Sequence, residues 1–114
     1  MQVTPLEFLI VHIEPNGLIV GRSGDADIPV GTVFTTLAQQ RYEGEGLNLT
    51  TVELGNIATV ELRLIEVHWF RRMIEVVPRG HSAGLRLEGH GIEAITNALA
   101  TKSKSDFFFL KACP

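Results

Sequence analysis

The stretch from Gly17 to Gly31, GLIVGRSGDADIPVG, has the glycine content of a loop that could hold a phosphate group. A Walker loop ends in Gly-Lys-Ser or Gly-Lys-Thr, because the lysine contacts the phosphates and the hydroxyl contacts magnesium. No lysine precedes Lys102. A dinucleotide loop needs Gly-x-Gly-x-x-Gly at the start of a helix, and Gly21 and Gly24 do not have that spacing. The stretch is therefore predicted to be a turn between two strands.

Metal binding and catalysis have weaker support. The histidines do not form a His-x-x-x-His or His-Glu-x-x-His pattern and there is no second cysteine, so a metal site would have to be assembled by the fold alone. Asp25 and Asp27 lie two residues apart, but aspartate is common in turns because its carboxylate accepts hydrogen bonds from nearby amides. Ser82 beside His81 lacks an orienting motif for nucleophilic catalysis. We predict no metal site, no cofactor and no enzymatic activity. The four histidines are His12, His68, His81 and His90.

Aromatic and arginine side chains in the second half of the chain suggest an interaction with RNA. Arginine beside exposed aromatic rings holds single-stranded RNA, because bases stack on the rings and guanidinium groups contact phosphates. In the alternative interpretation Trp69 and Phe70 lie on opposite faces of a sheet, one of them in the core, and the arginines pair with glutamates. The candidate binding residues are Trp69, Arg71, Arg72, Arg79 and Arg86, and the candidate glutamates are Glu66, Glu75 and Glu88.

The charge of the chain limits any such role to a local patch. The formal net charge of -3 opposes non-specific attraction to nucleic acid. Residues 1–50 carry two basic and six acidic side chains, whereas residues 51–90 carry five of each. The single cysteine, Cys113, cannot form an intramolecular disulfide. The first residues lack the basic segment of a signal peptide, and we expect a cytoplasmic protein.

Mostly strands are expected to position these residues, in a single domain of residues 1–114. Apolar alternation and β-branched residues predict strands over residues 6–13, 18–22, 32–37, 49–54, 58–70, 83–87 and 107–110. Residues 73–77 are expected to pair beside 58–70. A helix is predicted over residues 92–100, because Ile92, Ile95 and Leu99 recur on one face. Residues 38–48 are expected to form a long exposed connection, with a helical turn over 36–42 as the alternative.

The segment from Phe107 to Leu110 has two interpretations. It can close the sheet as a last strand, or it can form an exposed patch for a partner or for a second copy of the chain. Successive side chains of a strand point to opposite faces, so three consecutive phenylalanines cannot all be buried by one sheet. We therefore expect either cover from the helix or a homo-oligomer formed through this tail.

Two segments resemble the second domain of translational GTPases of the elongation factor Tu type. Residues 21–31, GRSGDADIPVG, resemble the family's Gly-Arg-Val-x-x-Gly-x-Ile-x-Val-Gly, with Ala26 in place of the middle glycine. Residues 80–89, GHSAGLRLEG, resemble its Gly-x-Asn-Val-Gly-x-x-Leu-x-Gly, with Ser82 in place of the asparagine. Residues 68–72, HWFRR, resemble a family segment that ends in an aromatic residue and a basic pair.

The resemblance implies a small closed β-barrel over about residues 6–90, followed by a helix and tail over 91–114. A turn at the barrel rim would then depend on Gly21, Arg22, Gly24 and Gly31, which are structural rather than functional residues. Small residues would allow the bend there, while Ile28 and Val30 would fill the interior. Such a barrel would have no exposed strand edge.

The expected function is that of a non-enzymatic binding module for RNA or for a partner associated with the ribosome. The alternative is a protein-binding role, such as an antidote that neutralises a toxin or a subunit of a larger assembly. That role would use the acidic first half and the aromatic tail.

Overall fold

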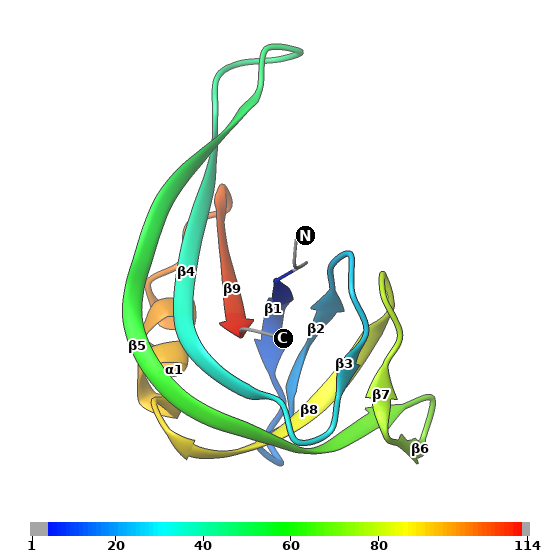
Figure 1. Ribbon diagram of the computed structural model, residues 1–114. Helices are drawn as coiled ribbons and strands as arrows, with labels where there is room; N and C mark the ends of the chain where they lie inside the picture. Colours follow the sequence, from blue (N-terminus) through cyan, green and yellow to red (C-terminus); the bar gives the residue numbers. More distant parts are fainter. Residues whose placement is uncertain (1–4, 113–114) are drawn as a thin grey trace.

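Residues 5–112 are described by a computed structural model, which has nine strands and one helix in this range (Figure 1). Cys113 and residues 1–4, on which the expected cytoplasmic location depends, lie outside the described residues. The strands are β1 (Leu6–Ile13), β2 (Ile19–Ser23), β3 (Ile28–Pro29), β4 (Val33–Glu43), β5 (Thr50–Trp69), β6 (Arg72–Ile74), β7 (Val76–Val77), β8 (Ser82–His90) and β9 (Asp106–Ala112), and the helix is α1 (Ile92–Ala100).

Six strands close into a ring. Their order is β4, β9, β1, β2, β8, β5 and back to β4, and every pairing is antiparallel. β6 extends β5 as a hairpin, and β3 pairs with β7 in a separate two-stranded sheet. The predicted mainly β fold, with a closed sheet and one helix near the C-terminal end of the described chain, is confirmed.

The inner faces of the ring form the core. Alternate residues of β1 and β9 point inward, among them Phe8, Phe108 and Leu110. The helix α1 adds Ile95, which is fully buried, and Ile92 and Leu99 pack against the core as the helical period predicts. The predicted limits of β1 and α1 match the structure. Within residues 5–112, no helix has the length and apolar character needed to cross a membrane.

The glycine-rich stretch contains β2, to which Gly21 and Arg22 belong, and β3, and residues 24–27 form the turn between these strands at the rim of the ring. No helix begins directly after Gly24, because the next element is the strand β3. The amides of Gly24 and Gly31 donate hydrogen bonds to carbonyl groups of β1 and β5. These amides are therefore occupied by the protein's own backbone. Ile28 fills the interior as expected, but Val30 is 40% exposed, so its predicted inward orientation is wrong. β3 is only two residues long, and Val30 leaves the sheet immediately after it.

Side chains of this stretch also form hydrogen bonds with the turn of residues 78–81. Arg22 Nε donates to the carbonyl oxygen of Gly80 at 2.9 Å, and Ser23 Oγ donates to that of Pro78 at 2.6 Å. The carboxylate of Asp27 accepts a hydrogen bond from the backbone amide of Arg79 at 2.8 Å. Arg22 and Asp27 thus act in the contact between two rim turns.

Two predicted boundaries are wrong. Residues 38–43, expected in a loop or a helical turn, continue β4, and the two strands expected over 49–54 and 58–70 are a single strand, β5. The barrel does not end near residue 90, because β9 pairs with both β1 and β4 and closes the ring. The interpretation of Phe107–Leu110 as a closing strand is confirmed, and only Phe107 and Phe109 of these residues remain partly exposed.

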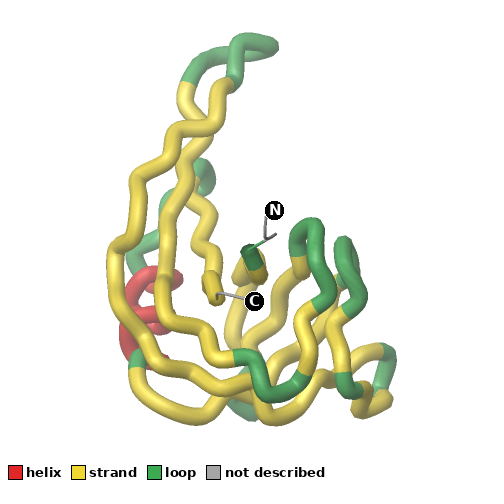
Figure 2. The backbone as a smooth tube through the Cα atoms, viewed as in Figure 1, coloured by secondary structure: helices red, strands yellow, loops and turns green. Residues whose placement is uncertain are grey.

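The hairpin of β4 and β5 extends beyond the ring (Figures 1 and 2). We call residues 42–51 the arm, because the pairing of β4 with β9 ends at Arg41. In the part of the chain that the structure describes, residues 50–60 of β5 pair only with β4, so one edge of this strand is free. The expectation of a barrel without exposed edges is therefore wrong, because its longest hairpin is longer than the neighbouring strands.

An ion pair fixes the base of the arm to the barrel. Arg41 Nε donates to Asp106 Oδ1 at 2.7 Å, and the amide of Ser103 donates to Asp106 Oδ2 at 3.1 Å. The Asp106 side chain is buried, whereas that of Arg41 is partly exposed. These contacts stabilise the carboxylate, and the hydrogen bond from Arg41 is the main cause of a pKa of Asp106 well below its usual range.

We expect Asp106→Asn to make the folded state less stable at neutral pH and less sensitive to acid. Because the pKa of Asp106 is lowered on folding, its stabilising effect is present above the ordinary pKa of 3.8 and is lost as the pH falls toward the folded-state pKa. Urea midpoints measured from pH 7 to pH 2 should therefore converge for the wild type and the variant at the acid end. Arg41→Gln should reproduce this pattern. If the urea midpoints of wild type and variant change in parallel with pH, the ion pair contributes nothing to the pH dependence of stability.

Candidate functional site

The hairpin of β5 and β6 ends in a two-residue turn with unusual backbone angles. Trp69 pairs with Arg72, which leaves Phe70 and Arg71 as the turn. Their φ angles are 49° and 64°, and they are the non-glycine residues with positive φ within residues 5–112. A type I′ turn requires positive φ at both central positions, and asparagine and glycine normally occupy it. A phenylalanine and an arginine are therefore strained here.

The turn presents an aromatic surface. Phe70 is 78% exposed, and Trp69 is half-buried. The two rings meet edge to face with centroids 4.6 Å apart. The alternative in which one of these residues lies in the core is wrong, because Trp69 is only half-buried and Phe70 is exposed, and neither belongs to the buried core.

Three of the predicted arginines belong to this region. Arg71 and Arg72 are exposed at the turn, and Arg79 is exposed on the rim turn of residues 78–81. The rings of Trp69 and His81 have centroids 6.1 Å apart, so the two turns are neighbours. Within residues 5–112 no ion pair engages these three guanidinium groups. We call Trp69, Phe70, Arg71, Arg72 and Arg79 the tip surface.

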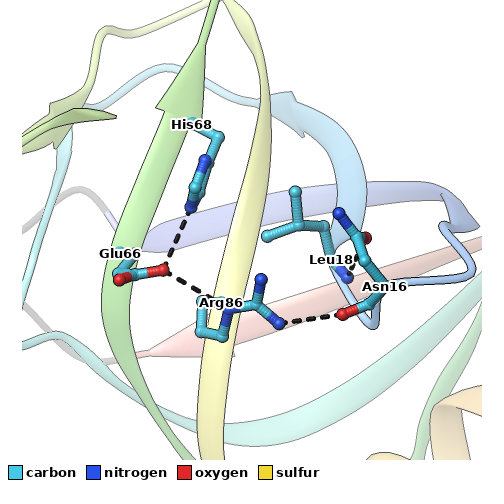
Figure 3. Close-up of polar contacts among 5 residues, drawn as sticks. All are labelled: Asn16, Leu18, Glu66, His68 and Arg86. Carbon is cyan, nitrogen blue, oxygen red and sulfur yellow. Dashed lines mark hydrogen bonds and ion pairs between the residues drawn. The ribbon is translucent and has the colours of Figure 1, made fainter. Parts of the chain in front are cut away.

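Arg86 is engaged in a different contact (Figure 3). Its Nε donates to Glu66 Oε1 at 3.3 Å, and its Nη1 donates to the carbonyl oxygen of Asn16 at 2.9 Å. His68 Nε2 lies 3.0 Å from the same carboxylate oxygen. The hydrogen bonds from His68 and Arg86 lower the pKa of Glu66. The predicted pairing of an arginine with Glu66 is thus confirmed for Arg86, whereas Glu75 and Glu88 form no ion pair among the described residues.

A shallow groove of about 430 Å³ lies beside the tip surface. Its apolar lining comes from β5, β6 and the end of the rim turn, and Glu66 and Glu75 border it. The sequence did not indicate this groove, because its apolar residues come from segments far apart in the chain. They are Val30, Ile65, Val67, Met73 and Ile74.

The residues considered for metal binding and catalysis are dispersed. Within residues 5–112 no group of three or more histidine, cysteine, aspartate or glutamate side chains could hold a metal ion. His12, near the end of β1, contacts Glu14 just beyond that strand, and His68 contacts Glu66 within β5. In each pair the two residues are two positions apart in the sequence. Asp27 accepts a hydrogen bond from the backbone amide of Arg79, which lies in a different turn, and not from a neighbouring amide of its own turn as the sequence suggests. What the site offers is an exposed ring for stacking and guanidinium groups for anionic partners.

Comparisons of the chain with protein-family models, with curated proteins and with solved structures find no match.

Proposed function

We propose that this protein is a non-enzymatic binding module and that its tip surface holds single-stranded RNA. In this role Phe70 stacks on an unpaired base, and Arg71, Arg72 and Arg79 contact phosphates. Each of these interactions is common in the recognition of single-stranded nucleic acids.

The strained turn at Phe70 and Arg71 is the observation that carries the proposal. Positive φ at a bulky residue costs free energy, and Asn-Gly at the same two positions would remove that cost. The side chains that cause the strain are also exposed, so they contribute little to the core. Strain that a fold does not need is characteristic of binding sites.

The distribution of charge supports the same role. Non-specific attraction to RNA is opposed by the net charge of -3, so binding must depend on a few local contacts. The tip surface has three guanidinium groups outside the ion pairs of the described chain, whereas Arg86 is partly neutralised by Glu66. We therefore expect that Arg86, unlike the three arginines of the tip surface, does not contact RNA.

The resemblance to the second domain of translational GTPases adds support from the fold. That resemblance implies a closed antiparallel barrel, and six strands close a ring here. In the proposed role, RNA of the translation machinery is the natural partner. The resembling segments 21–31 and 80–89 meet at the rim beside the tip surface, through the contacts of Arg22 and Ser23 with the 78–81 turn.

Filter binding of a labelled single-stranded RNA over a series of salt concentrations tests this function. We expect the affinity to fall as salt rises, and the double variant Arg71→Ala, Arg72→Ala to weaken binding and to reduce the salt slope by about one to two. Arg63→Ala, an exposed arginine on the outer face of β5, serves as the matched control and should bind like the wild type. Absence of salt-sensitive binding, or equal loss in both variants, would contradict the proposal.

The groove beside the tip favours a second candidate, the binding of a protein. An apolar groove next to the exposed Met73 could accept a side chain of a partner, as in an antidote to a toxin or a subunit of an assembly. A partner recovered from host lysate in equal amount before and after nuclease treatment, and lost on Met73→Asp, would favour this candidate over RNA.

A further inference from the structure

The arm has apolar side chains that the other described residues, 5–112, leave exposed. Leu47 is fully exposed, Leu49 is 57% exposed and Tyr42 is 47% exposed. The backbone of the arm projects beyond the ring (Figure 1), and at its base the Tyr42 ring contacts that of Phe107. Neighbouring exposed apolar residues on a projecting hairpin are typical of a protein–protein contact.

A complementary hollow lies on the same molecule at another place. It measures about 380 Å³ and lies between the end of β1 and the C-terminal half of α1. Most of its lining is apolar, and Lys102 borders it. The other lining residues are Val11, His12, Ile13, Thr96, Leu99 and Ala100.

The charges of the arm and the hollow are opposite. Residues 42–51 include Glu43 and Glu45 and no basic residue. The segment after α1 carries Lys102 and Lys104, and all four charged side chains are exposed. Within residues 5–112 none of the four takes part in an ion pair. Complementary charge of this kind selects a partner and fixes its register.

The hollow adjoins the base of the arm. Lys102 Nζ lies 5.6 Å from the centre of the Phe107 ring, and that ring meets Tyr42 edge to face at 4.9 Å. Two copies with their arms side by side and antiparallel would therefore bring the end of each arm close to the hollow of the other. A two-fold axis makes this contact twice.

We propose that two copies of this chain form a dimer by exchanging arms. Leu47 and Leu49 of each copy enter the hollow of the other, and Glu43 and Glu45 face Lys102 and Lys104 across the interface. Each copy contributes the ten residues of its arm and the seven residues that line its hollow. This number is close to the roughly 20–30 residues that each partner contributes to a stable interface. This proposal does not depend on RNA binding, because the tip surface lies on another hairpin.

Side chains rather than backbone pairing make this contact. The free edge of β5 could in principle accept another strand, but the register of β4 and β5 shifts between Phe34 and Thr36, between Leu37 and Ala38 and between Gln39 and Gln40. Such irregularities twist an edge and hinder strand addition.

Sedimentation equilibrium of the full chain at increasing concentration tests the dimer. We expect a monomer–dimer equilibrium for the wild type. The double variant Leu47→Asp, Leu49→Asp should raise the dissociation constant at least about tenfold, because two buried leucines are lost from each contact. Arg63→Asp, at an exposed position of β5 outside the arm, the hollow, the tip surface and the groove, should leave it unchanged.

A charge exchange distinguishes this interface from any other. The chain with Glu43→Lys and Glu45→Lys, and the chain with Lys102→Glu and Lys104→Glu, should each be monomeric, because like charges face each other in both. An equimolar mixture should dimerise, because both contacts of the mixed dimer are then matched. A wild type that is monomeric at every concentration, or a mixture that stays monomeric, would overturn the proposal.

Discussion

Replacing Phe70 and Arg71 by asparagine and glycine is expected to stabilise the protein and to weaken the proposed binding of RNA. Both positions have positive φ, which asparagine and glycine adopt at little cost, so the free energy of unfolding should rise by about 1–2 kcal/mol. Loss of one stacked base should cost about 1–3 kcal/mol of binding, and loss of the Arg71 guanidinium adds to it. Urea unfolding and filter binding on the same preparation measure the two effects.

Phe70→Tyr provides the control for this prediction. It keeps the ring and the strained backbone, so stability and RNA affinity should both remain close to those of the wild type. If the Asn-Gly variant is more stable but binds RNA as before, the strained turn has no role in RNA binding and the tip surface is not the binding site.

Gly21→Ala, in β2, is expected to have the largest effect on stability of any single glycine substitution in the stretch 17–31. A Cβ atom at Gly21 would collide with the carbonyl oxygen of Leu9 and would lie 2.6 Å from the Phe8 ring. Both neighbours belong to β1, which is held between β2 and β9, so relief requires a shift of the ring itself. Overpacking of this kind should cost about 3 kcal/mol or more, measured by chemical denaturation.

Two glycines of the same stretch that lie outside the strands provide graded controls. A Cβ atom at Gly24 would lie 3.8 Å from its nearest neighbour and needs no positive φ, so Gly24→Ala should be nearly neutral. Gly31 has free space around it but a φ of 99°, so Gly31→Ala should cost about 1–2 kcal/mol through backbone strain. Equal losses at all three positions would contradict this account of the turn.

The sequence predicts those parts of the fold whose side chains alternate between core and solvent. β1 and α1 were located correctly because their apolar residues follow periods of two and 3.6. The end of β4 was missed because Gln39, Gln40 and Arg41 lie near the arm, where a strand has little core to face. Gly55 interrupts the strand pattern in the sequence, so two strands over 49–54 and 58–70 are predicted. In the structure β5 continues through Gly55, which has a φ of 84°.

Part of the candidate tip surface can be predicted from the sequence for a similar reason. Side chains adjacent in sequence, such as Trp69, Arg71 and Arg72, indicate a local patch whatever the fold. The engagement of Arg86 by Glu66 and Asn16 depends on the pairing of β5 with β8 and on the position of the β1–β2 turn. The positive φ values at Phe70 and Arg71 could not be predicted, because neither residue favours them.

Titration of the isotope-labelled protein with a short single-stranded RNA, followed by amide NMR shifts, tests the proposed function most directly. We expect the shifts to concentrate at residues 69–73 and 79–82, which form and adjoin the tip surface. Unchanged spectra at excess RNA, or shifts centred on another face of the barrel, would contradict it.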